Sequence, residues 1–95
     1  PGVTLLERHK DCESAFWIYS MLVDNREDFY KYMDECNIAV SQVHERNDKH
    51  TCVKEFQTHL PNLDKTIGKV VNIPVGWWVT KEEREYIVNC IKKWN

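Results

Sequence analysis

The sequence lacks several features that would assign a function directly. Its 95 residues include only three glycines and three prolines, and the glycines stand apart at Gly2, Gly68 and Gly76. A P-loop or a GxGxxG turn needs clustered glycines, so neither is present. The longest apolar run, AFWIYSMLV, is interrupted by Ser20 and is too short to cross a bilayer. No basic segment leads into an apolar one, so we expect no signal peptide and no membrane association.

The chain also lacks an excess of positive charge. Its formal net charge is -2 at pH 7 and its pI is about 6.1, whereas nucleic acids and anionic membranes are bound through basic surfaces. We therefore expect neither as a partner. A chain of 95 residues is long enough for one domain and too short for two. Residues 1–95 are predicted to form a single small domain, with residues 1–12 as an irregular lead-in.

No CxxC pair is found among the four cysteines. Cys36 and Cys90 fall on apolar helical faces, where a thiol acts as a small hydrophobe. We predict a reduced, cytoplasmic protein without a disulfide framework. The chain begins with Pro1 and not with methionine, which suggests a fragment.

The hydrophobic pattern of the first half predicts a strand, a helix and a second strand. Residues 14–23, SAFWIYSMLV, indicate a strand that is apolar on both faces. A helix is expected after it, with Asn25 as its cap and Asn37 in the left-handed position that ends it. Residues 38–43 indicate a short strand.

The second half predicts a short helix, a strand and a final helix. Asn62 is the expected cap of the short helix, which ends near Gly68. VVNIPV indicates a strand whose end lies outside the ladder, because Pro74 has no N–H. Thr80 and Glu83 form a capping box at the start of the final helix. Its apolar stripe consists of Ile87, Cys90, Ile91 and Trp94.

This order of elements predicts the α+β class. We expect a two-layer α/β sandwich in which a small, three- to four-stranded, mainly antiparallel sheet carries its helices on one face. Two helices and a turn can cover only one face of such a sheet, whereas the strand at residues 14–23 is apolar on both. The second face is therefore expected to meet another domain or a second copy of the chain.

The polar run VHERNDKH, residues 43–50, is the main candidate for chemistry. His44, His50 and Cys52 do not have the spacing of a common zinc site, so no metal is expected. Read as composition alone, the run is typical of a solvated loop. Alternatively, it binds phosphate or sugar hydroxyls, because arginine pairs with oxyanions and asparagine is both donor and acceptor. The residues of this second interpretation are His44, Arg46, Asn47 and His50.

Trp77 and Trp78 are adjacent, and in a strand they would point to opposite faces. They are either core packing with one chance surface tryptophan or an anchor for a partner surface. The pattern leaves both interpretations open.

Two long stretches of the chain resemble a known family. They are SAFWIYSMLVDNREDFYKYMDECNIAVSQVHERNDKH and LPNLDKTIGKVVNIPVGWWVTKEEREYIVNCIKKW. In order and spacing they are similar to the C-terminal small domain of DegT/StrS-type nucleotide-sugar aminotransferases, the perosamine synthetase-like group of fold-type I pyridoxal phosphate enzymes. The resemblance runs from about Cys12 to Trp94, and no single motif within it is diagnostic.

The resemblance implies a parent enzyme that transfers an amino group, commonly from glutamate, to a keto sugar on a nucleoside diphosphate. The cofactor of such enzymes is pyridoxal phosphate on a lysine, and some relatives are dehydratases with histidine in its place. That lysine belongs to a large N-terminal domain that nothing in this chain matches. We therefore expect no catalytic residue here, and no cofactor bound to this chain alone.

The resemblance also implies partners for this chain. They are the missing N-terminal domain, or a second subunit in a homodimer, and the nucleotide-sugar substrate. His44, Arg46, Asn47 and His50 are the expected substrate contacts. The expected interface residues are Trp17, Tyr19, Trp77 and Trp78. The alternative is a free-standing dimeric binding domain without catalysis.

Overall fold

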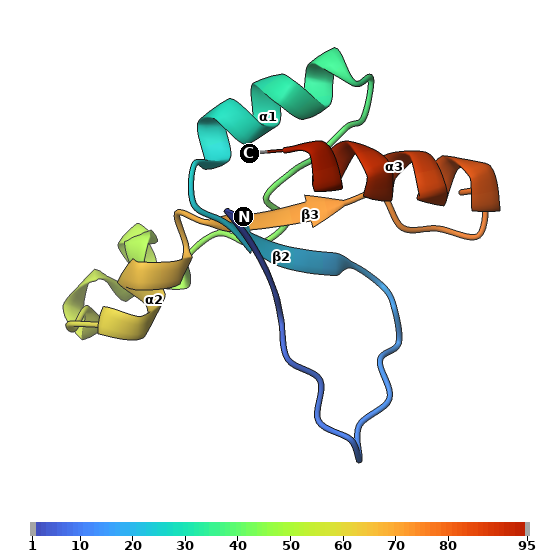
Figure 1. Ribbon diagram of the computed structural model, residues 1–95. Helices are drawn as coiled ribbons and strands as arrows, with labels where there is room; N and C mark the ends of the chain where they lie inside the picture. The colour runs from blue at the N-terminus through green and yellow to red at the C-terminus, as the bar shows by residue number, and fades with distance from the viewer. Residues whose placement is uncertain (1, 95) are drawn as a thin grey trace.

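The structure is a computed structural model and describes residues 2–94. In chain order its elements are β1 (Val3–Leu5), β2 (Tyr19–Val23), α1 (Arg26–Glu35), η1 (Asn47–Lys49), η2 (Thr51–Phe56), α2 (Pro61–Thr66), β3 (Val70–Ile73) and α3 (Lys81–Lys93), where η marks a 3-10 helix. Helices α1 and α3 lie on one side of the sheet, and two long loops project away from it (Figure 1). The predicted α+β, two-layer architecture with helices on one face is confirmed.

The sheet has the order β1-β2-β3 and is antiparallel throughout. Met21 of β2 pairs with Leu5 of β1 and with Val71 of β3, so these three side chains point to the same face. We call the face covered by α1 and α3 the helix face, and the opposite one the open face.

The core lies between the helix face and the two long helices. Its fully buried side chains are Met21, Val23, Val71, Phe29 and Met33. Trp94 closes one end of this core, with ring centroids 5.4 Å from Phe29 and 5.3 Å from Tyr32. The apolar stripe predicted for α3 packs here, together with Phe29 and Met33 of α1.

The helix ends agree in most respects with the sequence. Thr80 Oγ1 accepts a hydrogen bond from the Glu83 N–H at 3.2 Å, and Glu83 Oε2 accepts one from the Thr80 N–H at 2.8 Å. The predicted capping box is therefore confirmed. Asn37 closes α1 with a left-handed φ of 58°. Asn25 holds the cap position of α1, but its side chain donates to Asp28 Oδ2 at 2.6 Å and not to the backbone.

Three sequence predictions were wrong. Residues 1–12 are not wholly irregular, because Val3–Leu5 form β1. The first predicted strand begins at Tyr19 and not at residue 14, since Phe16 has a φ of 51° that breaks the extended path. The short helix α2 begins at Pro61 after Leu60, so Asn62 is not its cap.

The strand predicted at residues 38–43 was also wrong in its extent. It is reduced to one antiparallel bridge between Ser41 and Asn72. The bridge lies beside β3, so β3 runs between β2 and this segment. The open face is less apolar than expected, because Thr4, Ser20 and Asn72 share it with two aliphatic side chains, Leu22 and Val70.

Asn72 is the buried polar residue of the described chain, with 4% of its surface exposed. Its backbone exchanges two hydrogen bonds with Ser41, of 2.7 and 3.1 Å. Its side chain donates to Ser20 Oγ at 2.6 Å and accepts from the Val43 N–H at 3.0 Å. One side chain therefore joins β2, β3 and the start of the polar loop.

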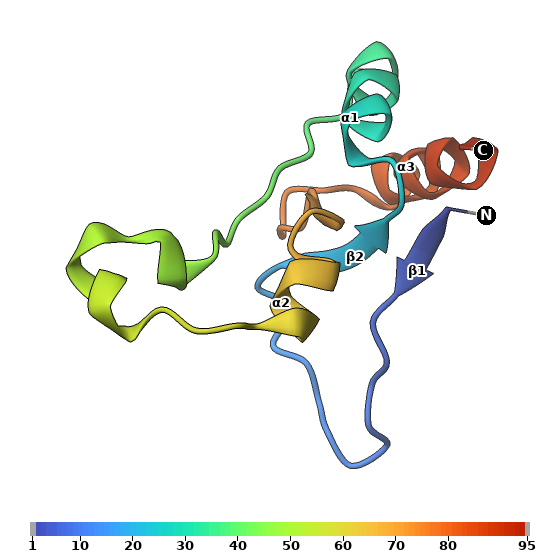
Figure 2. The same ribbon diagram turned by 90° about the vertical axis from the view of Figure 1, so that its left-hand side faces the viewer.

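The molecule is extended for its size. Its radius of gyration is 15.4 Å, against about 12.4 Å for a compact domain of this length. Its accessible surface is 7762 Å², against about 5,800 Å² for a compact monomer of its mass. Figure 2 shows the cause, since the loop between β1 and β2 and the segment around η1 and η2 both stand clear of the sheet. Within residues 2–94, no helix combines the length and apolarity that a bilayer crossing requires.

Replacing Asn72 with alanine is expected to lower the free energy of unfolding by about 1–3 kcal/mol, because the Val43 N–H and the Ser20 hydroxyl lose their partner. Urea denaturation of the chain measures this difference. The matched control is Asn62→Ala on the exposed start of α2, which should change stability by less than about 0.5 kcal/mol. Equal effects of the two substitutions would contradict the role assigned to Asn72.

Candidate functional site

The polar loop that follows Val43 is held by Arg46. Its Nε and Nη2 donate to the two carboxylate oxygens of Asp48 at 2.6 and 2.7 Å, and its Nη1 donates to Asp64 Oδ1 at 2.7 Å. Asp64 belongs to α2, so the guanidinium ties the loop to that helix. Within residues 2–94, three of its five N–H groups are used. Arg46 is therefore a structural clasp that still has donors to offer an oxyanion.

The clasp changes the electrostatics of the loop. Hydrogen bonds from Arg46 hold the pKa of Asp48 below its ordinary value. The pKa of Arg46 is raised above its ordinary value, mainly by the hydrogen bonds to Asp48 and secondly by the bond to Asp64. Lys49 donates to Glu45 Oε2 at 2.6 Å, and this bond lowers the pKa of Glu45. Glu45 and Asp48 are thus both held as carboxylates, each paired with a cation of the same loop.

A second anchor holds the start of the loop. Arg26, the first residue of α1, donates through Nη1 to Gln42 Oε1 at 2.8 Å and to the Ile67 carbonyl at 2.9 Å. Gln42 in turn donates to the His44 carbonyl at 2.9 Å. The backbone at His44 is therefore connected to α1 through the side chains of Gln42 and Arg26.

The other predicted substrate residues are exposed on this anchored loop. His44, Asn47 and His50 all lie at the surface. The ring of His44 meets the indole of Trp17 edge-on, with centroids 6.0 Å apart and an interplanar angle of 69°. The structure thus brings together one residue predicted for substrate and one predicted for an interface.

The predicted interface residues do not form one patch. Trp17 lines a hollow on the side of Val43 and Asn72, whereas Tyr19 lines a groove beside α3. Trp77 and Trp78 lie in the turn before α3, with 93% and 64% of their surfaces exposed. Neither tryptophan of this pair belongs to the core, so the core-packing interpretation does not hold. A Cβ on Gly76 would lie 2.5 Å from the Trp78 ring, so the turn needs glycine for this packing.

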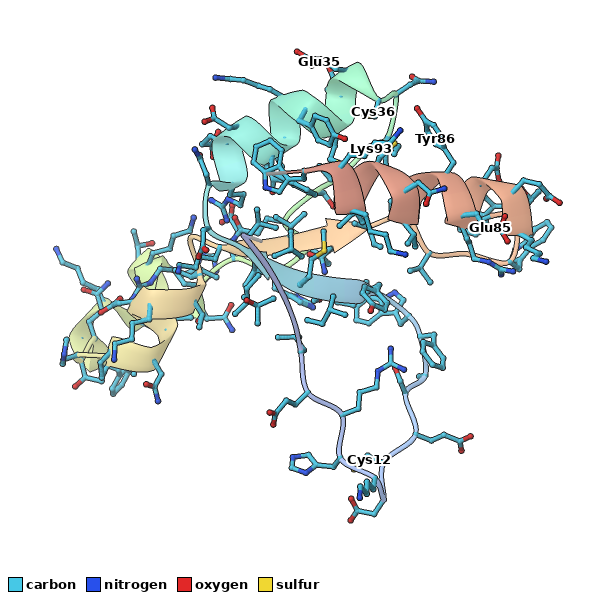
Figure 3. All side chains as sticks on the ribbon, in the orientation of Figure 1. Cys12, Glu35, Cys36, Glu85, Tyr86 and Lys93 are labelled. Carbon is cyan, nitrogen blue, oxygen red and sulfur yellow. The ribbon has the colours of Figure 1, made fainter. Side chains whose placement is uncertain are left out.

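The cysteines are free, and Cys12 lies at the far end of the loop between β1 and β2 (Figure 3). Cys36 and Cys90 pack between α1 and α3, as predicted. Tyr86 Oη donates to the Cys36 carbonyl at 3.0 Å, and burial raises the pKa of the Cys36 thiol. This thiol is therefore kept protonated and is no nucleophile.

Neither a metal site nor a cofactor site is formed by the described residues. Within residues 2–94, no three His, Cys, Asp or Glu side chains gather as a metal ion requires. A Schiff-base lysine is normally buried so that its amine can be neutral, but the lysines of this chain are exposed, apart from the half-buried Lys69. Lys69 pairs with Asp24 at 2.8 Å. The residues present do not fit pyridoxal phosphate by themselves.

The fold and the loop together define a class. The chain matches the C-terminal quarter of sugar aminotransferases, so the predicted resemblance is confirmed. The crystal structure of the sugar aminotransferase CalS13 from Micromonospora echinospora is 44% identical with a TM-score of 0.90, over 98% of this chain. The crystal structure of AtS13 from Actinomadura melliaura is 41% identical with a TM-score of 0.91, over 99% of this chain.

A curated protein gives a weaker match. It is the erythromycin biosynthesis sensory transduction protein EryC1 of Saccharopolyspora erythraea, 21% identical over 97% of this chain. No protein-family model matches the chain. The chain spans 26% of the length of EryC1 and of each solved structure.

Several residues that build the site were missed. Asp48 and Asp64 hold Arg46, and the signal for Asp48 was its position two residues after the arginine. Asn72 was hidden in a strand-like run, although a lone asparagine among VVNIPV is itself unusual. The contact between Trp17 and His44 had no local signal, since it joins segments 27 positions apart.

The clasp predicts a specific dependence of stability on pH. Because the pKa of folded Asp48 is depressed, its stabilisation is present above the unfolded value of about 3.9 and is lost as pH falls through the folded value. We expect Asp48→Asn to be less stable than the natural chain at about pH 7, and the difference to shrink towards about pH 2.5.

Urea denaturation at a series of pH values measures this difference. Asp34→Asn is the matched control, because Asp34 is an exposed acid without an ion pair within residues 2–94. It should leave the pH dependence unchanged. A stability difference for Asp48→Asn that stays constant from neutral to acidic pH would contradict the clasp.

Proposed function

We propose that this chain is the C-terminal small domain of a perosamine synthetase-like enzyme, one that transfers an amino group to a nucleotide-linked keto sugar. The observation that carries the proposal is the match to the sugar aminotransferase CalS13, at 44% identity and a TM-score of 0.90 over 98% of this chain. Since the chain spans 26% of that relative, the reaction belongs to the parent protein. The chain alone is inactive.

The large exposed surface of this chain supports the proposal that it packs against the rest of a larger protein. The accessible area exceeds that of a compact monomer by about 2,000 Å², which is the order of area that a stable protein interface buries. Large apolar side chains make up part of this surface, among them Trp17, Phe56 and Trp77, each more than 70% exposed. These side chains contact the rest of the parent enzyme or its second subunit.

The polar loop is the part of this chain that meets substrate. His44, Asn47 and His50 offer imidazole and amide groups to diphosphate oxygens and sugar hydroxyls, and Arg46 adds its two remaining N–H donors. The anchors at Arg26 and Arg46 keep the loop in one shape before substrate arrives, which lowers the entropy cost of binding. Arg26 and Arg46 therefore favour substrate binding by holding the loop in place.

Pyridoxal phosphate is the electron sink in enzymes of this kind. No residue of this chain is assigned to it. Its lysine, its phosphate site and the acid for its ring nitrogen belong to the large domain of the parent protein. This chain binds and orients the sugar nucleotide.

The parent protein, purified at full length, tests the proposal. With pyridoxal phosphate, glutamate and a nucleotide-linked 4-keto sugar, it should yield the amino sugar nucleotide and 2-oxoglutarate, detected by mass spectrometry. A full-length protein that binds no pyridoxal phosphate and consumes no glutamate with any keto sugar nucleotide would refute the assignment. Release of water from the sugar without consumption of glutamate would instead indicate a dehydratase.

Within that enzyme, Asn47→Ala and His50→Ala should each raise the KM for the sugar nucleotide by about tenfold or more, with kcat nearly unchanged, since a lost hydrogen bond to a charged group costs binding energy. Steady-state kinetics give both constants. The control is Lys54→Ala on η2, in the same projecting segment, which should alter neither. Unchanged KM values for both loop variants would exclude the loop from substrate binding.

The second candidate is a free-standing dimeric binding domain, and the exposed tryptophans favour it. Sedimentation of the 95-residue chain separates the two. A tight dimer in which Trp17→Ser or Trp77→Ser abolishes association supports this candidate. A monomer at micromolar concentration supports the aminotransferase domain.

A further inference from the structure

The loop between β1 and β2 contains a strained residue where it returns to the sheet. Phe16 has a left-handed φ of 51°, which is rare for a residue with a bulky side chain. The chain bends at the next residue, Trp17. Strain of this kind persists only where surrounding contacts hold it, and it is often found at functional sites. The contacts of Phe16 and the position of Trp17 therefore indicate what the bend does.

Two contacts hold Phe16 in this conformation. Its N–H donates to Ser14 Oγ at 3.1 Å, a local bond of the kind that stabilises turns. The two legs of the loop extend from the sheet and meet at a turn near Cys12 (Figure 3). From the first leg, the guanidinium carbon of Arg8 lies 4.9 Å from the centre of the Phe16 ring and 5.9 Å from that of Tyr19. Distances up to about 6 Å are those of a cation–π interaction, so Arg8 links the two legs at the bend.

The bend changes the direction in which Trp17 points. In an uninterrupted strand, Trp17 would share a face with Tyr19, because side chains two residues apart point the same way. Tyr19 lines the groove beside α3, whereas Trp17 lines the hollow that includes Val43 and Asn72. The bend has therefore turned the indole away from α3 and towards the segment that leads into the polar loop.

There the indole of Trp17 meets the polar loop. Its ring centroid lies 6.0 Å from that of His44, with an interplanar angle of 69°, an edge-on arrangement that aromatic pairs favour. Among residues 2–94, Trp17 supplies the one aromatic ring that packs against His44. The His44 backbone is already held through its carbonyl by Gln42. The contact with Trp17 therefore restricts the freedom that remains, which is rotation of the imidazole about its side-chain bonds.

We propose that Trp17 is a positioning residue for His44. The bend at Phe16, held by Arg8, turns the indole onto the imidazole and fixes its orientation before substrate binds, which lowers the entropy cost of binding. The proposal rests on the proposed function for the role of His44 as a substrate contact. Trp17 acts through His44 and not on the substrate itself. Because 73% of the Trp17 surface stays exposed, its outer side remains free to contact another part of the parent protein.

NMR spectra of the 95-residue chain test the geometry. The ring protons of His44 should show nuclear Overhauser contacts to the indole protons of Trp17. Phe16→Gly should keep these contacts, because glycine takes a left-handed φ without strain. Phe16→Val should lose them, because a β-branched residue strongly disfavours that φ. Arg8→Ala should weaken them, and Arg8→Lys should retain them in part, since lysine also binds aromatic faces.

The matched control is Phe56→Val, the same substitution at another exposed phenylalanine. It should leave the contacts between Trp17 and His44 intact. Contacts that are absent from the natural chain, or that persist unchanged in Phe16→Val, would overturn the proposal.

Kinetics of the parent enzyme test what the contact does. Trp17→Leu should raise the KM for the sugar nucleotide about twofold to tenfold, as expected for the loss of one aromatic pair. The kcat and the KM for glutamate should stay nearly unchanged. Trp17→Phe should restore most of the affinity, because it keeps an aromatic ring beside His44.

A double-mutant cycle shows whether Trp17 acts through His44. In a His44→Ala background, Trp17→Leu should have no further effect on the KM, since both substitutions remove the same interaction. An equal rise in KM with and without His44 would mean that Trp17 acts on the substrate or on another part of the protein directly, and would overturn the proposal.

The two experiments separate this proposal from the proposed function. The NMR contacts are measured without substrate, so they do not depend on transamination. A parent that consumes no keto sugar nucleotide, in a chain whose His44 contacts respond to residues 16 and 17 as stated, would refute the function and leave the positioning of His44 intact. An active parent whose KM is unchanged by Trp17→Leu would do the reverse.

Discussion

The structure depends on the hydrogen bonds of one buried amide, that of Asn72. Its side chain joins Ser20 of β2 to the Val43 N–H, and its backbone forms the only ladder contact of residues 38–43 in the described chain. A buried amide is tolerated only when its donors and acceptors are used. By using them, Asn72 fixes Ser41 and Val43 against β3, and the polar loop begins from there. The position of the candidate site is thus decided inside the sheet.

From Asn72 outwards, the loop is held by charges. Arg26 orders its start through Gln42, and Arg46 ties its middle to α2 through Asp64. Few apolar contacts support this segment, since η1 and η2 contain no buried residue. Its conformation is therefore sensitive to pH and ionic strength in a way that the core around Phe29 and Met33 is not. A loop of this kind suits recognition of an anionic substrate, because its order comes from the same type of contact that the substrate makes.

Sequence reasoning predicted the helix layer well and the sheet less well. Helix α3 was visible because its capping box and its apolar stripe are local patterns, and α1 for similar reasons. The strands were misjudged where tertiary contacts decided the outcome. AFWIY is as strand-like as YSMLV, but the left-handed φ of Phe16 ends the ladder at Tyr19. Val3–Leu5 form a strand only because β2 offers them an edge.

The sequence predicted which segment forms the candidate site, but not the contacts that hold that segment. The run VHERNDKH was identified from its residue types, which are visible in any window. The hydrogen bond from Arg46 to Asp64 could not be predicted, because Asp64 is 18 positions away in the sequence. The prediction that another domain or subunit covers part of this chain now rests on a different surface. The open face proved half polar, and the bare apolar surface lies instead in the groove beside α3 and on the exposed tryptophans.

The placement of the four tryptophans has a consequence for optical measurements. Trp17, Trp77 and Trp78 face water, whereas Trp94 packs against Phe29 and Tyr32. In the isolated chain, the three water-exposed indoles dominate the fluorescence emission, which lies at long wavelength. On unfolding, the emission changes mainly because Trp94 becomes exposed. If Trp17, Trp77 and Trp78 become buried upon assembly, their emission shifts to shorter wavelength. Intrinsic tryptophan fluorescence therefore reports association of the chain.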